Sequence, residues 1–212
     1  MSSVLSYYLT NYAGIPVGWI LPLIFQRWGA ATFQEGVRYY AEVHTSTWNA
    51  FVHSVFMPMT AYGILLVLGQ VLPMFYNIMV WMKSRYPVIH GGVPRPTRDA
   101  YLEVTPDVSR SIHRFFYQAY MSHYVTVDPM VGALCALYYL PSLYMANLDC
   151  TVYPRSRKLL ITKGCTVSTV ALIIQEILGH WVGGDDPSRP EAVGNAILYA
   201  MYFSVSHFFN HA

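Results

Sequence analysis

The chain has 212 residues, of which 54% are apolar, 16% aromatic and only 11% charged, against about 25% charged residues in ordinary soluble proteins. A soluble domain of this length needs more charge to cover its surface, so the composition predicts a single membrane domain over residues 1–212. The formal net charge of +2 is too small to indicate nucleic-acid binding. We expect an all-α integral membrane bundle, with about four to five helices embedded among membrane lipids.

Five apolar segments are expected to lie in or on the membrane: 15–28, 51–82, 129–148, 167–182 and 192–209. The first is too short to cross the hydrocarbon, which requires about 20 apolar residues. The second is either one tilted helix or a hairpin broken near residues 69–73. Because these alternatives place the flanking basic residues differently, the positive-inside rule gives no orientation from the sequence alone.

The polar insert 83–128 separates the second segment from the third. Its first part is rich in Pro and Gly and predicts a loop, while residues 111–125 mix basic and aromatic residues at helical spacing. We expect an interfacial amphipathic helix there, with Arg114 toward water. Three aromatic side chains should face the apolar side: Phe115, Phe116 and Tyr120. Three histidines of the insert are expected to be solvent-exposed: His90, His113 and His123.

The stretch "YYAEVHTSTWNAFVHSVFMP", residues 39–58, places histidines at the start of a long apolar segment. Asn49 and His53 are four residues apart and share one face of a helix. We expect His44 to precede this helix on a chain that folds back over its first turn, because "TST" at 45–47 offers an N-cap. His44 and His53 then converge. The alternative is that both histidines bind water or lipid at headgroup level.

A second polar group lies in "QEILGH", residues 175–180, where Glu176 and His180 are four residues apart and are expected to share a face. Ionisable groups at membrane depth are usually functional, so Glu176 is a candidate base or proton relay, although it could simply cap His180. Near the C-terminus, His207 and His211 are also four apart, but His211 is expected to be incidental. Two further carboxylates, Asp185 and Asp186, are interpreted as solvated turn residues.

Imidazoles that converge from separate segments suit Fe, Zn, Cu or Ni. The interpretation is one metal bound by His44, His53 and His180, with His207 a possible fourth ligand. Asn49 and Gln175 are expected to orient the imidazole rings through hydrogen bonds. The three cysteines have no zinc-site spacing and are expected to be reduced thiols: Cys135, Cys150 and Cys165.

These stretches resemble the membrane 2-hydroxy fatty acid dioxygenases. The family's pattern Y-x3-H-x4-N-x3-H-S-x-F-x-P is carried by Tyr40, His44, Asn49, His53, Ser54, Phe56 and Pro58. "ALYYLP" at 136–141 is similar to a mid-chain stretch of the family, and "QEILGH" is similar to its Q-x-x-G-H motif. "RPEA" at 189–192 is similar to the family's R-P-A-L. The family usually has Glu four residues after the motif histidine, where this chain has Gly184, so Asp185 or Asp186 could replace it.

The resemblance implies an integral membrane oxidoreductase, located in the endoplasmic reticulum in eukaryotes. Such enzymes use Fe(II) and O2 to shorten long-chain 2-hydroxy fatty acids by one carbon, an α-oxidation step in the degradation of sphingoid bases such as phytosphingosine. The alternatives are a non-enzymatic membrane scaffold or lipid-binding bundle with interfacial histidines, and a metal transporter. Metal content separates them, since only the enzyme should bind iron tightly.

Overall fold

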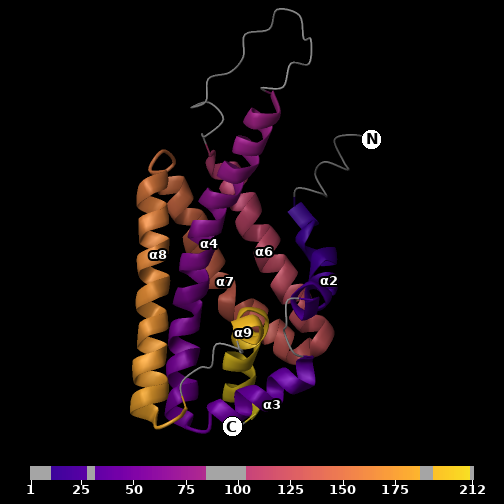
Figure 1. Cartoon of the computed structure of the whole chain (residues 1–212), viewed down its shortest axis with the longest axis vertical. Helices are drawn as coiled ribbons and strands as arrows, with labels where there is room; N and C mark the ends of the chain where they lie inside the picture. The colour runs from indigo at the N-terminus through magenta and orange to yellow at the C-terminus, as the bar shows by residue number, and fades with distance from the viewer. Residues whose placement is uncertain (1–10, 28–31, 85–103, 187–192, 211–212) are drawn as a thin grey trace, which may run out of the picture.

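A computed structural model describes residues 11–27, 32–84, 104–186 and 193–210, and the described chain is helical throughout, with no strand (Figure 1). The predicted all-α class is confirmed. The helices are α2 (Gly14–Arg27), α3 (Phe33–Val43), α4 (Thr47–Ser84), α6 (Pro106–Val127), α7 (Pro129–Val152), α8 (Arg157–Ile174), the π-helix η1 (Gln175–Trp181) and α9 (Val193–Asn210).

Three helical stretches of the described chain are long and apolar enough to cross a membrane: Thr47–Met79, Pro129–Val152 and Arg157–Trp181. The apolar part of α2 is shorter, as expected for a segment that does not span. The long second segment is one continuous helix, α4, rather than a hairpin. These features confirm a helical bundle of membrane-protein character.

Helices α4 and α7 run in one direction along the bundle, and α6 and α8 run antiparallel to them (Figure 1). We call the end where α7 is followed by α8 the hairpin end; α4 also ends there and α6 begins there. The opposite end is the site end, where α4 begins and η1 terminates.

Two prolines inside α4 are tolerated because neighbouring helices satisfy the carbonyl groups that they leave unpaired. Pro58 has no N–H for the Ser54 carbonyl, and the Tyr138 hydroxyl of α7 donates to that oxygen at 2.5 Å. Pro73 likewise frees the Gly69 carbonyl, which accepts from Ser109 Oγ of α6 at 2.9 Å. In a membrane an unsatisfied backbone group is costly, so these contacts keep α4 continuous.

Helices α4 and α8 pack closely where glycines of the two helices meet. A Cβ atom on Gly63 would lie 2.5 Å from the Gly164 carbonyl oxygen and 2.3 Å from Ser168 Oγ. Small residues let helix backbones approach in membranes, where packing replaces the hydrophobic effect as the driving force. Nearer the hairpin end, Lys163 Nζ lies 2.8 and 3.0 Å from the two oxygens of Asp149, which also accepts from the Tyr62 hydroxyl.

The expected helix at 111–125 is confirmed as part of α6, but it does not lie alone at the headgroups. It packs against α2, α4 and α7, and the Arg114 guanidinium donates to Asn11 Oδ1 at 2.9 Å. The prediction that His113 and His123 are solvated is wrong, because their exposed fractions are 0% and 3%. The physical reason is the single-residue connection to α7, which forces the two helices together along their length. His90 lies outside the described residues.

Candidate metal centre

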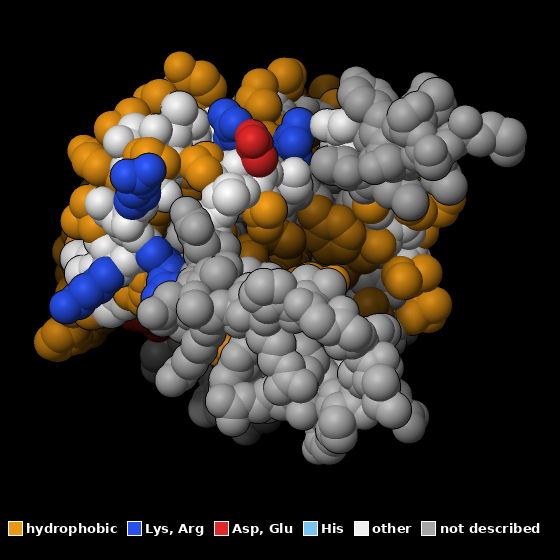
Figure 2. Space-filling view, turned by 90° about the horizontal axis from the view of Figure 1, so that it is seen from above, with side chains coloured by type: hydrophobic (Ala, Val, Ile, Leu, Met, Phe, Trp, Pro, Cys, Tyr) orange, Lys and Arg blue, Asp and Glu red, His pale blue; other side chains and the backbone are white. Residues whose placement is uncertain are grey.

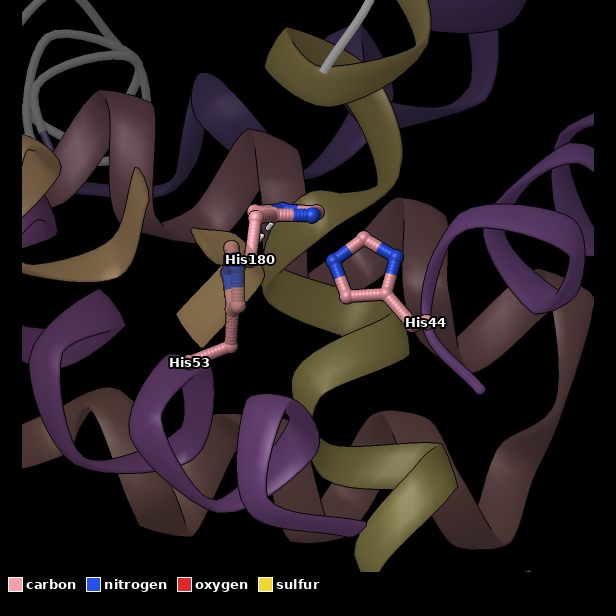
Figure 3. Close-up of side chains that lie close together, drawn as sticks. All are labelled: His44, His53 and His180. Carbon is pink, nitrogen blue, oxygen red and sulfur yellow. Dashed lines mark hydrogen bonds between the residues drawn. The ribbon is translucent and has the colours of Figure 1, made fainter. Parts of the chain in front are cut away.

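Three histidines from separate segments meet at the site end of the bundle (Figure 3). The candidate ligand nitrogens of His44, His53 and His180 all lie within 4.8 Å of one another, and all three residues are buried. The ring centroids are 4.7 Å apart for His44–His53, 4.8 Å for His44–His180 and 5.2 Å for His53–His180. The predicted convergence is confirmed, while the role of these rings as ligands stays a prediction.

His44 follows the last residue of α3 and is fixed by its own turn. Its Nδ1 lies 3.1 Å from the Tyr40 carbonyl oxygen, to which it donates, and its ring stacks on the Tyr40 ring with centroids 3.8 Å apart. Nε2 therefore carries the lone pair; it is buried without a hydrogen-bond partner among the described residues. Burial, with the neighbouring His53 and His180 rings, lowers the pKa of His44 to about 3. The ring is thus neutral, the form that binds metals.

His180 is held in a complementary way by the chain that follows it. Its Nδ1 donates to the Asp186 carbonyl oxygen at 2.6 Å, so its Nε2 also presents a lone pair. That Nε2 lies 3.3 Å from His53 Nε2. At this distance a proton on His53 Nε2 can be donated to His180 Nε2, and the other His53 tautomer would leave two lone pairs that a cation can bind. The arrangement of the three rings therefore fits a bound cation, and hydrogen bonds to backbone carbonyls orient two of them.

The π-helical turn η1 decides which side chains face the cluster. In a π-helix the hydrogen bonds join residues five apart, which places Gln175 and His180 on one face, and both are 1% exposed. Gln175 Nε2 donates to Thr60 Oγ1 at 3.0 Å and to the Ala171 carbonyl at 3.1 Å. Glu176 is exposed, so the prediction that it shares a face with His180 is wrong. It lies outside the cluster of rings.

Asp185, which the sequence analysis named with Asp186 as a possible replacement for the family's Glu, connects the two sides of the site. Its carboxylate accepts from the backbone N–H groups of Thr45 and Ser46, each at 3.1 Å, and from Asn49 Nδ2 at 2.8 Å; the Thr45 hydroxyl also donates to it. Burial raises the pKa of Asp185, but these hydrogen bonds lower it more, so the net shift is downward. The prediction that Asp185 is a solvated turn residue is therefore wrong.

The Asp185 carboxylate also lies beside the N-terminus of α4, where the helix dipole favours a negative charge. We refer to its bonds to Thr45, Ser46 and Asn49 as the Asp185 clasp. Asn49 Nδ2 is 3.4 Å from His180 Nδ1, so the clasp reaches the ring cluster. A Cβ on Gly179 would lie 2.5 Å from Asn49 Oδ1, which explains why a glycine precedes His180. Asn49 thus lies beside the ring that it was predicted to orient.

Two predicted residues remain unplaced. His207 belongs to α9, but its side chain is not among those described, and His211 lies outside the described residues. Tyr40 was not predicted as part of the site, although its spacing of one helical turn before His44 was a usable signal. The three cysteines are free thiols, as expected.

Comparison with protein-family models, characterised proteins and solved structures finds no match to this chain. The function therefore has to be argued from the site itself. Three imidazole rings whose nitrogens lie this close together can hold a divalent transition metal, and this donor set alone does not select among Fe, Zn, Cu and Ni.

Proposed function

We propose that the protein is an Fe(II)- and O2-dependent dioxygenase that shortens long-chain 2-hydroxy fatty acids by one carbon. The observation that carries this proposal is the buried cluster of His44, His53 and His180 at one end of a bundle with membrane-spanning helices. In a eukaryotic host the enzyme would belong to the endoplasmic reticulum membrane. There it would serve fatty acid α-oxidation in the degradation of sphingoid bases such as phytosphingosine.

The chemistry of the substrate fits a three-imidazole site. A 2-hydroxy acid presents a carboxylate and a neighbouring hydroxyl oxygen, which together chelate a metal, and three protein ligands leave positions open for such a chelate and for O2. A bound Fe(II) would supply the activation of O2 for oxidation at the hydroxyl-bearing carbon. The overall conversion, R–CH(OH)–COOH + O2 → R–COOH + CO2 + H2O, balances with O2 as the acceptor of all electrons. No separate reductant is required.

The surroundings of the cluster suit a substrate with a long acyl chain. On the outer faces of α4 and η1, next to His53 and His180, large apolar side chains are exposed: Trp48, Phe51, Val55 and Trp181. Trp48 Nε1 donates to the Leu178 carbonyl at 2.8 Å and so joins these two helices near the site. These apolar faces would let the acyl tail of a substrate lie in the surrounding lipid beside the helices that carry His53 and His180.

The test uses protein purified in detergent. It should contain about one equivalent of tightly bound iron, and with O2 it should convert a long-chain 2-hydroxy fatty acid to the acid one carbon shorter. The matching acid without the hydroxyl should not react, because it lacks one chelating oxygen. His53→Ala and His180→Ala should abolish turnover, whereas His123→Gln, a buried histidine of α6, should retain it. Absence of bound metal would favour a scaffold, and equal conversion of both acids would indicate a different lipid oxygenase.

A further inference from the structure

The described side chains at the two ends of the bundle carry opposite net charge. Among the described side chains, the cations at the hairpin end are Arg110, Arg155, Arg157, Lys158 and Lys163, and the acids there are Asp107 and Asp149. Both acids are already paired, with Arg110 and Lys163. At the site end and in η1 the acids are Glu35, Glu42, Asp128, Glu176, Asp185 and Asp186, and the described cation is Arg38.

The excess of positive charge at the hairpin end lies beside apolar side chains. Figure 2 views the molecule from this end and shows Lys and Arg side chains close to hydrophobic ones. Arg155 and Lys158 are exposed, and Arg157 is half-buried, at the connection between two stretches long enough to span a membrane. Cations at the ends of spanning helices lie at the level of lipid headgroups, where they meet phosphate groups.

Because α4 is one continuous helix, the orientation of the bundle in the membrane can be inferred. Since α4 crosses once, its C-terminus, the start of α6 and the α7–α8 connection all lie at the same end (Figure 1). Short connections rich in Lys and Arg remain on the cytoplasmic side, whose leaflet carries the anionic lipids. We propose that the hairpin end is a binding surface for anionic phospholipid headgroups of the cytoplasmic leaflet, and that the histidine cluster therefore lies toward the opposite leaflet.

This proposal does not depend on the proposed function, because it rests on the distribution of charge and the path of the helices. It does bear on the site. Carboxylates concentrated near the histidine cluster produce a negative potential that attracts a divalent cation, while the same end avoids the anionic leaflet. One charge distribution thus serves both orientation and cation supply.

Cysteine labelling in sealed membrane vesicles tests the orientation. In a Cys165→Ser background the other two cysteines, Cys135 and Cys150, are buried and give a signal only after denaturation. A membrane-impermeant maleimide should label Arg155→Cys from the cytoplasmic side alone. The Arg38 side chain at the site end is 84% exposed, and the same reagent should label Arg38→Cys from the opposite side alone. The reverse pattern, or equal labelling of both variants from each side, would overturn the proposal.

Reconstitution tests the lipid partner. In nanodiscs, replacing part of the phosphatidylcholine by phosphatidylglycerol should raise the Tm, and high salt should reduce that shift. The shift should be lost in the variant Arg155→Gln, Arg157→Gln, Lys158→Gln and kept in Arg38→Gln. A Tm that does not respond to phosphatidylglycerol, or a shift that survives in the triple variant, would contradict the assignment. The labelling experiment does not depend on whether the triple variant folds.

Discussion

Replacement of Asp185 by Ala should weaken metal binding although Asp185 is not one of the ring ligands. The substitution removes the acceptor for Thr45 N–H, Ser46 N–H and Asn49 Nδ2, and so loosens the segment of His44 from that of His180. Loss of one intramolecular hydrogen bond typically costs about 0.5–1.5 kcal/mol. Loss of groups that orient metal-binding histidines typically lowers affinity about 10–100-fold, which corresponds to about 1.4–2.7 kcal/mol.

Anaerobic titration of the purified protein with Fe(II) measures this effect, and thermal unfolding of the metal-free form measures the loss of the hydrogen bonds separately. Asp185→Asn should lie between wild type and Asp185→Ala, because an amide oxygen still accepts hydrogen bonds without the charge. Asp186→Ala is the matched control, since Asp186 is exposed and touches His180 through its backbone carbonyl. If Asp185→Ala binds Fe(II) as tightly as Asp186→Ala does, the clasp does not support the site.

Three further variants test other parts of the structure. Gly164→Leu should lower the Tm strongly, because a Cβ at Gly164 would already lie 2.6 Å from the Gly63 carbonyl oxygen; Cys165→Leu, on the exposed side of α8, should not. The pKa of His44 is about 3 in the folded protein, against the ordinary value of 6.5 in the unfolded chain. The unfolded chain therefore binds more protons below pH 6.5, and the Tm of the metal-free protein should fall as the pH drops below about 6.5. The Tm of His44→Gln should fall less. Deleting Glu176 should leave Fe(II) affinity close to wild type.

The sequence was sufficient for those parts of the fold that depend on local composition. Low charge and long apolar segments predicted a helical membrane bundle, and helical spacing placed Asn49 and His53 on one face. The convergence of His44 with His53 was also predicted, from the expectation that His44 precedes the helix on a chain that folds back over its first turn. Each of these inferences uses residues that are within about two helical turns of one another.

The burial of α6 could not be predicted in this way, because its polar side chains form hydrogen bonds with residues that are distant in the sequence. Ser109 binds a carbonyl freed by Pro73 in α4, and His113 Nδ1 lies 3.0 Å from Asn147 Oδ1 in α7. A helix with such residues has the same amphipathic pattern as one at headgroup level. Periodicity shows which positions of a helix are polar, but it does not show whether their side chains form hydrogen bonds with water or with another helix. The contacts of Asp185 could not be predicted for the same reason, since its partners are about 140 residues away.

The position of His180 depends on the π-helical turn η1, which α-helical periodicity does not predict. The Q-x-x-G-H motif of the family that this chain resembles has two residues between Gln and Gly, whereas this chain has three: Glu176, Ile177 and Leu178. In an α-helix an added residue would rotate His180 by about 100° away from the face of Gln175. The π-helical turn absorbs the added residue, because residues five apart now share the face that residues four apart share in an α-helix. Deleting Glu176 should therefore convert this turn to an α-helix without moving His180 from the cluster. Inserting an alanine after Glu176 should turn the ring away and abolish Fe(II) binding. Equal loss of binding in both variants would show that the π-helical turn does not set this register.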